Sequence, residues 1–461
     1  MPENRKTTGF TLVEAILAGA LFLMISLSLV SAVLYGQEGA ALAGKRARAL
    51  YLAEEGIEAV RNIQEQAFAN LTPGTYGLST TANSWVLAGA SDTIDIFNRQ
   101  ITIANIDAQK KTVNVVINWA QNLQRAGTIS LSTTLTNWRA LTIGNWANPN
   151  TLAASIDLPG NTDGWRVDVV GNYAYVARAA NPSNFHIIDI TNPASPVLLS
   201  TTNIAGNPQD VTVAGNYAYI ATTNNTGELA VYNITNPAAP TLAGSYNAAG
   251  NEDGLAVSVV GNMAYLGRVS GTDPEFYALN ITNPAAIASL GSLQLSNNIN
   301  EIAISGNHAF IASANTAQEL QVVDITNPAA MSQLASYNAA GNGAGNDVII
   351  AGNLLALALS TNSVALLNIT TPTAPALYSS VAIGGIANGI SFGNNDTYLF
   401  VASANATAEL QVFDVTNPAV TTLVGNYNAA ASANDVFYDS ISDRAYLTDT
   451  NNATEFLVVA P

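Results

Sequence analysis

The chain contains no cysteine and only two histidines among its 461 residues. Without cysteine it can form no disulfide, no thiolate metal site and no cysteine nucleophile. Charged residues make up 10% of the chain, against about 25% in a typical soluble domain. Asn, Thr, Ala and Gly fill the polar positions instead, which is typical of an all-β protein with many turns. The length predicts two or three domains.

Positive charge is scarce in the second part of the chain. Residues 148–461 contain four Arg, no Lys and 22 Asp and Glu, so their net charge is −18. Residues 1–147 contain 11 basic and 10 acidic residues. Because nucleic-acid binding depends mainly on Lys and Arg, we expect the acidic part to bind no nucleic acid. It can attract cations or basic partners.

An apolar run follows a short polar leader that ends at Gly9. Glu14 is the only charged residue between Phe10 and Gly36. About 20 apolar residues span a bilayer, so we expect this run to cross a membrane. A carboxylate inside such a segment is costly, and Glu14 is therefore predicted to have a partner. The alternative is a solvated carboxylate at the membrane interface.

The order of Gly9, Phe10 and Glu14, with the leader before the apolar run, resembles the N-terminus of type IV pilins and pseudopilins. The resemblance implies that a prepilin peptidase removes residues 1–9 and that Phe10 is N-methylated. It also implies that Glu14 pairs with the N-terminal amine of a neighbouring pilin subunit and sets the assembly register. A plain N-terminal membrane anchor is the alternative. The lack of cysteine departs from the many pilins that have a C-terminal disulfide loop.

The helical period continues beyond the apolar run. Apolar residues recur at steps of three and four between residues 44 and 68, which indicates a helix. No proline interrupts residues 10–70, so we predict one helix over this range, about 85 Å long. Residues 71–138 predict a small antiparallel sheet, with 93–106 as one alternating strand. The long helix and the sheet together resemble a pilin head. Residues 139–148 are expected to form the linker to the rest of the chain.

The remaining residues, 149–461, form a repeat. Gly-Asn pairs recur at intervals of 41 to 46 residues, and Thr-Asn-Pro motifs recur between them. The pairs begin at Gly171, Gly215, Gly261, Gly306, Gly352 and Gly393. Gly-Asn closes a tight hairpin, and Pro ends a strand because it cannot donate to the ladder. The repeats resemble LVIVP repeats, and four strands per period of about 45 residues match a propeller blade. The predicted fold is an α+β pilin-like part followed by an all-β, seven-bladed propeller.

The last repeat predicts how the ring closes. It lacks an outer strand, because the chain stops at Pro461. Residues 152–157 form a strand with no blade of their own. We expect this strand to pair with residues 455–459, since propellers avoid unpaired strand edges.

Charged residues recur near the start of the innermost strands. Five positions before the Gly-Asn turns stand Arg166, Asp210, Ala256, Glu301 and Asp347, and Asp435 matches them in the seventh copy. The carboxylates could surround one mouth of the channel and hold a cation such as calcium. The alternative, which we prefer, is that each carboxylate accepts backbone hydrogen bonds from its own turn.

Neither histidine has a partner at ligand spacing. His308 takes a place that other repeats give to Tyr or Met, and His186 lies in a strand beside Phe185. We therefore predict no metal or catalytic role for either residue.

These patterns predict a minor type IV pilin or pseudopilin that displays a propeller head for adhesion to a surface ligand or a protein partner. No catalytic residue or cofactor is predicted. Arg5 and Lys6 favour a cytoplasmic N-terminus. The chain would be held in the cytoplasmic (inner) membrane by one helix with its head exported, and after assembly would lie at the cell surface or in a pilus. Two alternatives are a pilin-anchored extracellular propeller enzyme, such as a hydrolase or lyase, and a structural cap of a secretion pseudopilus.

Overall fold

The computed structural model has two compact units, Met1–Leu141 and Thr142–Pro461. It describes residues 12–66, 68–81, 84–105, 110–122, 125–136, 144–149, 151–178 and 184–461. Gly9 and Phe10 lie outside these residues, and so does the side chain of Glu14. The expected cleavage, methylation and assembly positions therefore stay predictions.

The first unit is built on a long helix, α1 (Leu12–Gln66), which a 3-10 turn, η1 (Phe68–Asn70), follows. Its 55 residues correspond to about 82 Å at 1.5 Å per residue. Ala53 and Val60, in the second half, are buried against the sheet. Among the described residues, no helix is both long and apolar enough to cross a membrane. The apolar run expected to do so lies mostly outside the residues whose side chains are described.

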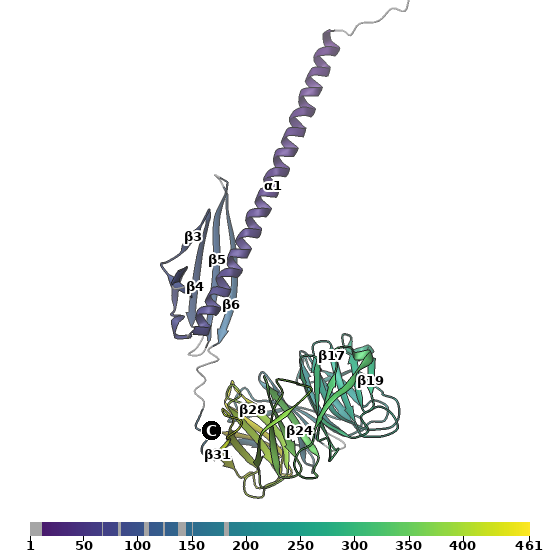
Figure 1. Cartoon of the computed structure of the whole chain (residues 1–461). Coiled ribbons are helices and arrows are strands. Elements are labelled where there is room, and N and C mark those ends of the chain that lie inside the picture. The colour runs from purple at the N-terminus through teal and green to yellow at the C-terminus, as the bar shows by residue number, and fades with distance from the viewer. Residues whose placement is uncertain are drawn as a thin grey trace, which may run out of the picture. The chain divides into compact units, whose positions relative to one another are not determined.

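An antiparallel sheet lies beside the helix (Figure 1). Its strands are β1 (Gly74–Thr81), β2 (Ser84–Ala88), β3 (Asp92–Ile94), β4 (Phe97–Asn105), β5 (Lys110–Asn122) and β6 (Arg125–Thr136). The order is β2-β1-β4-β5-β6, and β3 pairs with β4. The run 93–106, expected as one strand, is divided because Asp95 takes a positive φ of 54° and turns the chain between β3 and β4.

The second unit comprises, within the described residues, seven four-stranded antiparallel sheets, the blades of a propeller (Figure 1). Blade 1 is β8 (Gly164–Val170), β9 (Tyr173–Arg178), β10 (Phe185–Asp189) and β11 (Val197–Thr202). Blade 2 is β12 (Pro208–Ala214), β13 (Tyr217–Thr222), β14 (Leu229–Asn233) and β15 (Thr241–Tyr246). Blade 3 is β16 (Gly254–Val260), β17 (Met263–Arg268), β18 (Phe276–Asn280) and β19 (Ala288–Leu293), with η2 (Pro284–Ala286) before β19.

The other four blades repeat this arrangement from the inner strand outward. Blade 4 is β20 (Ile299–Ser305), β21 (His308–Ser313), β22 (Leu320–Asp324) and β23 (Ser332–Tyr337), with η3 (Pro328–Ala330) before β23. Blade 5 is β24 (Gly345–Ala351), β25 (Leu354–Leu359), β26 (Ser363–Asn368) and β27 (Ala376–Ala382). Blade 6 is β28 (Ala387–Gly393), β29 (Tyr398–Ser403), β30 (Leu410–Asp414) and β31 (Thr422–Tyr427). Blade 7 is β32 (Ala433–Asp439), β33 (Arg444–Asp449), β34 (Phe456–Ala460) and β7 (Thr151–Ile156).

The seam of the ring lies in blade 7. Strand β7 pairs antiparallel with β34, so the first strand of this unit completes the last blade. The pairing joins Ile156 to Phe456 at one end and Thr151 to Ala460 at the other. Each inner strand therefore has a neighbouring blade on both sides, and the apolar cores lie between successive blades.

Trp146 fixes the entry of the chain into the ring. It falls in the segment 139–148 that was expected to be a linker, but its side chain is fully buried. Its indole Nε1 donates to Asp443 Oδ1 at 2.9 Å, and its ring meets Phe400 edge-on at a centroid distance of 4.8 Å. Asp443 lies in the hairpin turn between β32 and β33. The chain thus enters the propeller at the end of blade 7 where the Gly-Asn turns of the other blades lie, which we call the far face.

Candidate functional site

Each of the seven inner strands has a β-bulge near its start. In β8, for example, Gly164 pairs with Arg178 and Arg166 pairs with Ala177, so Trp165 is the extra residue. A bulge redirects a side chain and increases the local twist. The bulge residues are Trp165, Gln209 and Leu255 in blades 1–3 and Asn300, Asn346, Asn388 and Asn434 in blades 4–7. We call this set the bulge ring.

The bulge ring lines a cavity of about 390 Å³ at the end of the channel where the inner strands begin, which we call the mouth. Arg166, Ser360 and Ile386 complete its lining. The sequence predicts charged residues at one mouth of the channel, but this prediction does not include the residues of the bulge ring beside them. A signal was present, because an Asn immediately precedes the predicted charged residue in three repeats, at Asn300, Asn346 and Asn434.

The four Asn residues of the bulge ring are anchored in the same way. The Nδ2 of each donates to the carbonyl of the first residue of the next inner strand. The distances are 2.7 Å from Asn300 to Gly345, 2.8 Å from Asn346 to Ala387, 2.8 Å from Asn388 to Ala433 and 2.6 Å from Asn434 to Gly164. These bonds tie each blade to the next and give the four amides one common orientation.

The residues that follow the bulges form a second level, which we call the charged ring. Its members in blade order are Arg166, Asp210, Ala256, Glu301, Asp347, Gly389 and Asp435. The structure therefore brings the predicted residues together. Gly389 was not predicted, because the turn of blade 6 is longer and shifts the count by one residue. Glycine is needed there, since a Cβ would lie 2.4 Å from Asp435 Oδ1.

The Asp residues of the charged ring link neighbouring blades. Asp210 accepts the N–H of Val211 in its own strand and the N–H of Val257 in the next blade, both at 2.8 Å. Asp347 and Asp435 do the same with their own and following strands. The preferred sequence interpretation, hydrogen bonds from each carboxylate's own turn, was wrong for these three residues, because one oxygen accepts from the next residue of the same strand and the other from the adjacent blade.

Arg166 supplies positive charge to this ring. Its guanidinium lies 3.5 Å from Glu301 and 3.8 Å from Asp435. Burial by itself would lower the pKa of Arg166, but Glu301, Asp435 and the other ring carboxylates outweigh this and hold the pKa above its ordinary value. Among the described residues, no group of three or more His, Asp or Glu side chains is arranged to hold a metal ion. The calcium hypothesis remains untested.

Several carboxyl groups around the channel hold their protons more tightly than usual. Burial raises the pKa of Asp435 to about 7 and that of Asp168, two residues after Arg166 in β8, to about 6. Burial and then the Asp210 carboxylate raise the pKa of Glu301 well above its usual range. Near neutral pH the ring therefore keeps some of its protons, which limits the negative charge beneath the mouth.

A repeated buried acid fixes the loops at the mouth. In blade 2, Glu228 accepts the N–H of Ala248 at 2.8 Å, across the loop that leads to the next blade. The equivalent acids are Glu275, Glu319, Glu409 and Glu455, which bond Leu295, Ala339, Ala429 and Leu158. In the sequence, a Glu before Leu or Phe recurs at the same place in five repeats, and this pattern could have predicted the buried acids. These bonds position the mouth loops.

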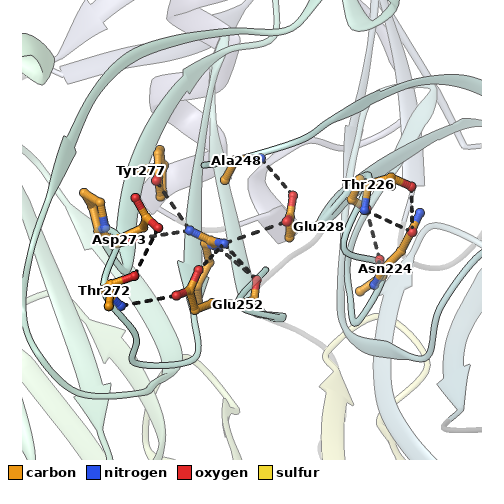
Figure 2. A network of polar contacts seen from close by, with 12 residues as sticks. Asn224, Thr226, Glu228, Ala248, Glu252, Thr272, Asp273 and Tyr277 are labelled. Atoms are coloured by element: carbon orange, nitrogen blue, oxygen red, sulfur yellow. Dashed lines mark hydrogen bonds and ion pairs between the residues drawn. The ribbon is translucent and has the colours of Figure 1, made fainter. Parts of the chain in front are cut away.

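Two buried arginines strengthen the same loops. Arg178 of blade 1 contacts Glu455, directly before β34 of blade 7, at 3.1 Å. Arg268 contacts Glu252 at 3.1 Å and lies 3.8 Å from Glu228. Figure 2 shows Glu228 beside Ala248, and Glu252 beside Thr272, in this network. With Arg166, three of the four arginines of the propeller are therefore committed to interior ion pairs.

Neither histidine lies in the cavity lining. His186 is fully buried in β10, and its Nδ1 lies 3.1 Å from the Thr201 hydroxyl. His308 starts β21 beside Phe310. The structure thus does not bring either side chain to the charged ring or the bulge ring.

Comparison with known families identifies the repeats. The LVIVD repeat model matches residues 161–203, 205–248, 298–339 and 384–429, which cover blades 1, 2, 4 and 6. The name LVIVP, inferred from the sequence, was therefore wrong, although the period and architecture agree. The chain carries LVIVD repeats that form a β-propeller. No curated protein matches it by sequence.

Solved structures resemble the propeller in fold. A chain in the crystal structure of a mitotic checkpoint complex has a TM-score of 0.55 and 15% identity, covering 68% of this chain and 93% of that chain. The β-propeller domain of Myceliophteria thermophila Cps50 (Swd1) has a TM-score of 0.50 and 11% identity, covering 66% and 98%. At these identities the similarity shows the fold alone.

Proposed function

We propose that this chain is a minor type IV pilin or pseudopilin whose propeller is an exported binding head. The observation that carries the proposal is the contrast between the halves of α1. Its second half is buried on its own sheet, whereas Leu23, Leu29 and Val30 in the first half are 62%, 67% and 55% exposed. Such apolar surface favours burial in a bilayer or among neighbouring subunits. The Gly9, Phe10 and Glu14 pattern supports the same assignment.

Processing of the N-terminus tests the proposal. In cells with an active prepilin peptidase, N-terminal sequencing of the membrane-extracted protein should find a chain that starts at Phe10. Gly9→Ala should keep the leader. Glu14→Val is the matched control, because it should be cleaved normally but fail to assemble. Recovery of only the Met1 form from wild-type cells would overturn the proposal.

Protease access tests the orientation. Arg5 and Lys6 should hold the N-terminus in the cytoplasm, so the head should lie outside the inner membrane. Protease added to spheroplasts should then degrade the propeller while a cytoplasmic marker survives. Full protection of the propeller in intact spheroplasts would contradict an exported head.

The position of the mouth supports binding by the head. Gly164 accepts from the bulge residue Asn434, so the start of β8 lies at the mouth. The chain enters at the opposite end, where Trp146 bonds Asp443. The entering segment, residues 144–149, therefore contacts the ring at the end away from the mouth. A cap of a secretion pseudopilus would need no ligand at this cavity, so binding measurements on the purified protein separate the cap from the adhesin.

A further inference from the structure

The mouth offers two kinds of surface around one cavity. Its volume of about 390 Å³ falls in the range of small-molecule sites, roughly 300–1,000 Å³. Blades 4–7 contribute four amides, and blades 1 and 3 contribute Trp165 and Leu255. The Trp165 side chain is 39% exposed, and Ile386 beside the cavity is 41% exposed. Apolar groups therefore face the cavity together with a row of polar ones.

The amides are prepared to bind hydroxyl groups. In each Asn of the bulge ring one N–H is used in the bond to the next blade, which fixes the plane of the amide. Among the described residues, no protein group donates to the four Oδ1 atoms. Each amide can therefore accept one hydrogen bond and donate another. Because the four anchoring hydrogen bonds are the same, the unbonded sides of the four amides repeat around the mouth, one in each of blades 4–7.

The charges around the cavity disfavour an anionic ligand. Arg166 lines the cavity, but its charge is already paired with Glu301 and Asp435. The propeller segment 148–461 has a net charge of −18, which repels an anion. The charged ring below has its carboxylates bonded to backbone N–H groups or to Arg166. A neutral ligand meets no such repulsion.

We infer that the bulge ring is a binding site for an uncharged carbohydrate, with hydroxyl groups on the Asn amides and an apolar sugar face on Trp165. Sugar hydroxyls both donate and accept, as the unbonded sides of the amides require. The C–H face of a pyranose is apolar and can pack on an indole ring. This inference rests on the proposed role of the propeller as a binding head, but it does not depend on the pilin assignment.

Blocking the mouth provides the first test. The full-length protein, purified in detergent, is screened on an array of neutral and acidic glycans, and the best neutral glycan is measured by calorimetry. Ile386→Arg places a long charged side chain at the cavity and should abolish detectable binding. Ile441→Arg is the matched control, because Ile441 is 70% exposed in the hairpin turn of blade 7 at the far face. It should bind like wild type.

Two further variants test the contacts themselves. Trp165→Ala removes the apolar platform, and Asn346→Ala removes one amide; each should weaken binding roughly tenfold or more. Asn346→Ala also loses the bond to Ala387, so its thermal unfolding is measured in parallel. If the Asn346→Ala variant is destabilised, the test of the binding site depends on Trp165→Ala, because the Trp165 side chain is partly exposed.

The outcomes separate this inference from the wider proposal. Neutral-glycan binding that Ile386→Arg abolishes and Ile441→Arg preserves supports the site. A folded wild-type protein that binds no neutral glycan, or prefers acidic ones, overturns it, as does binding that both arginine variants leave unchanged. If the protein instead captures a protein partner, the binding head stands and the carbohydrate site falls. A failure of Gly9 processing would remove the pilin assignment and leave the carbohydrate result intact.

Discussion

The mouth and the far face of the propeller are the two ends of the same inner strands, but their residues follow different rules. At the far face, Gly-Asn recurs in six blades, and the glycine takes a positive φ of 57° to 62° in five of them. At the mouth, the bulge position is Trp, Gln, Leu or Asn according to the blade. The comparison teaches that a residue recurs where the backbone conformation or a repeated contact requires it, as the four Asn residues of blades 4–7 do through one common bond. It varies where neither requirement holds.

Opening the ring should have the largest effect on the mouth and the far face. Deletion of residues 149–158 removes β7 from blade 7 and leaves β34 with an unpaired edge. Because closure couples the first and last blades, both faces should be lost together, and the cooperative unfolding transition of the propeller should disappear in calorimetry. A deletion variant with an unchanged transition would show that the seam is not needed.

Removal of charge should affect the mouth more than the far face. Arg166→Ala leaves the buried carboxylates of Glu301 and Asp435 without their cation and should cost about 3–5 kcal/mol of unfolding free energy. Arg444→Ala is the control, because within the part of the chain that the structure describes the Arg444 side chain donates only to the carbonyls of Ser442 and Asp443 in the far-face turn. Denaturation followed by tryptophan fluorescence measures both variants. Equal losses would contradict a special role for the charged ring.

The charged ring should also make stability depend on pH. An unfolded Asp titrates near pH 3.9, whereas the pKa of Asp435 in the folded protein is raised to about 7. The folded state therefore binds more protons between these values, and stability falls as pH rises. We expect a loss of about 2–3 kcal/mol for this group from pH 5 to 8, seen as a falling Tm.

A pair of Asp→Asn variants checks the source of this dependence. Asp435→Asn should reduce the change in Tm between pH 5 and 8 without abolishing it, because burial also raises the pKa of Asp168 to about 6 and that of Asp449 to about 7. Asp324→Asn should leave it unchanged, because hydrogen bonding to Thr326 lowers the pKa of Asp324, which therefore titrates below this window. Equal slopes in wild type and Asp435→Asn would contradict the assignment.

The smallest expected effect compares two glycines. Gly389→Ala at the mouth brings a Cβ within 2.4 Å of Asp435 Oδ1 and should cost about 1–2 kcal/mol by over-packing. Gly352→Ala at the far face meets no atom within 4 Å, but its φ is 58°. It should cost about 1 kcal/mol through backbone strain. In an Asp435→Ala background the cost of Gly389→Ala should shrink only in part, because its Cβ would still lie 2.7 Å from the Cα of residue 435, whereas that of Gly352→Ala should stay.

The periodic signals predicted the architecture because each depends on local chemistry. Gly-Asn at φ near 60° closes the hairpin in five blades. The third strands end at an Asp or Asn, such as Asp189 or Asn233, whose side chain accepts the N–H two residues on, before the Pro is reached. Counting the strands of the last repeat predicted that residues 152–157 close the ring. The structure confirms this prediction with β7 at Thr151–Ile156. The prediction of one strand over 93–106 failed because Asp95 has no Gly or Pro beside it to indicate a turn.

The sequence by itself determined the repeat, the turns and the level of the charged residues, since inner strands in the same register place equivalent residues at the same height. Only the tertiary structure decided that Asp210 bridges to Val257 and that Arg166 reaches Glu301 three blades away. Only the bulges turn the Asn side chains toward the mouth. The physical reason is that these contacts join residues about one or more blade lengths apart in the chain. Their geometry follows from ring closure and local twist, which no single repeat contains.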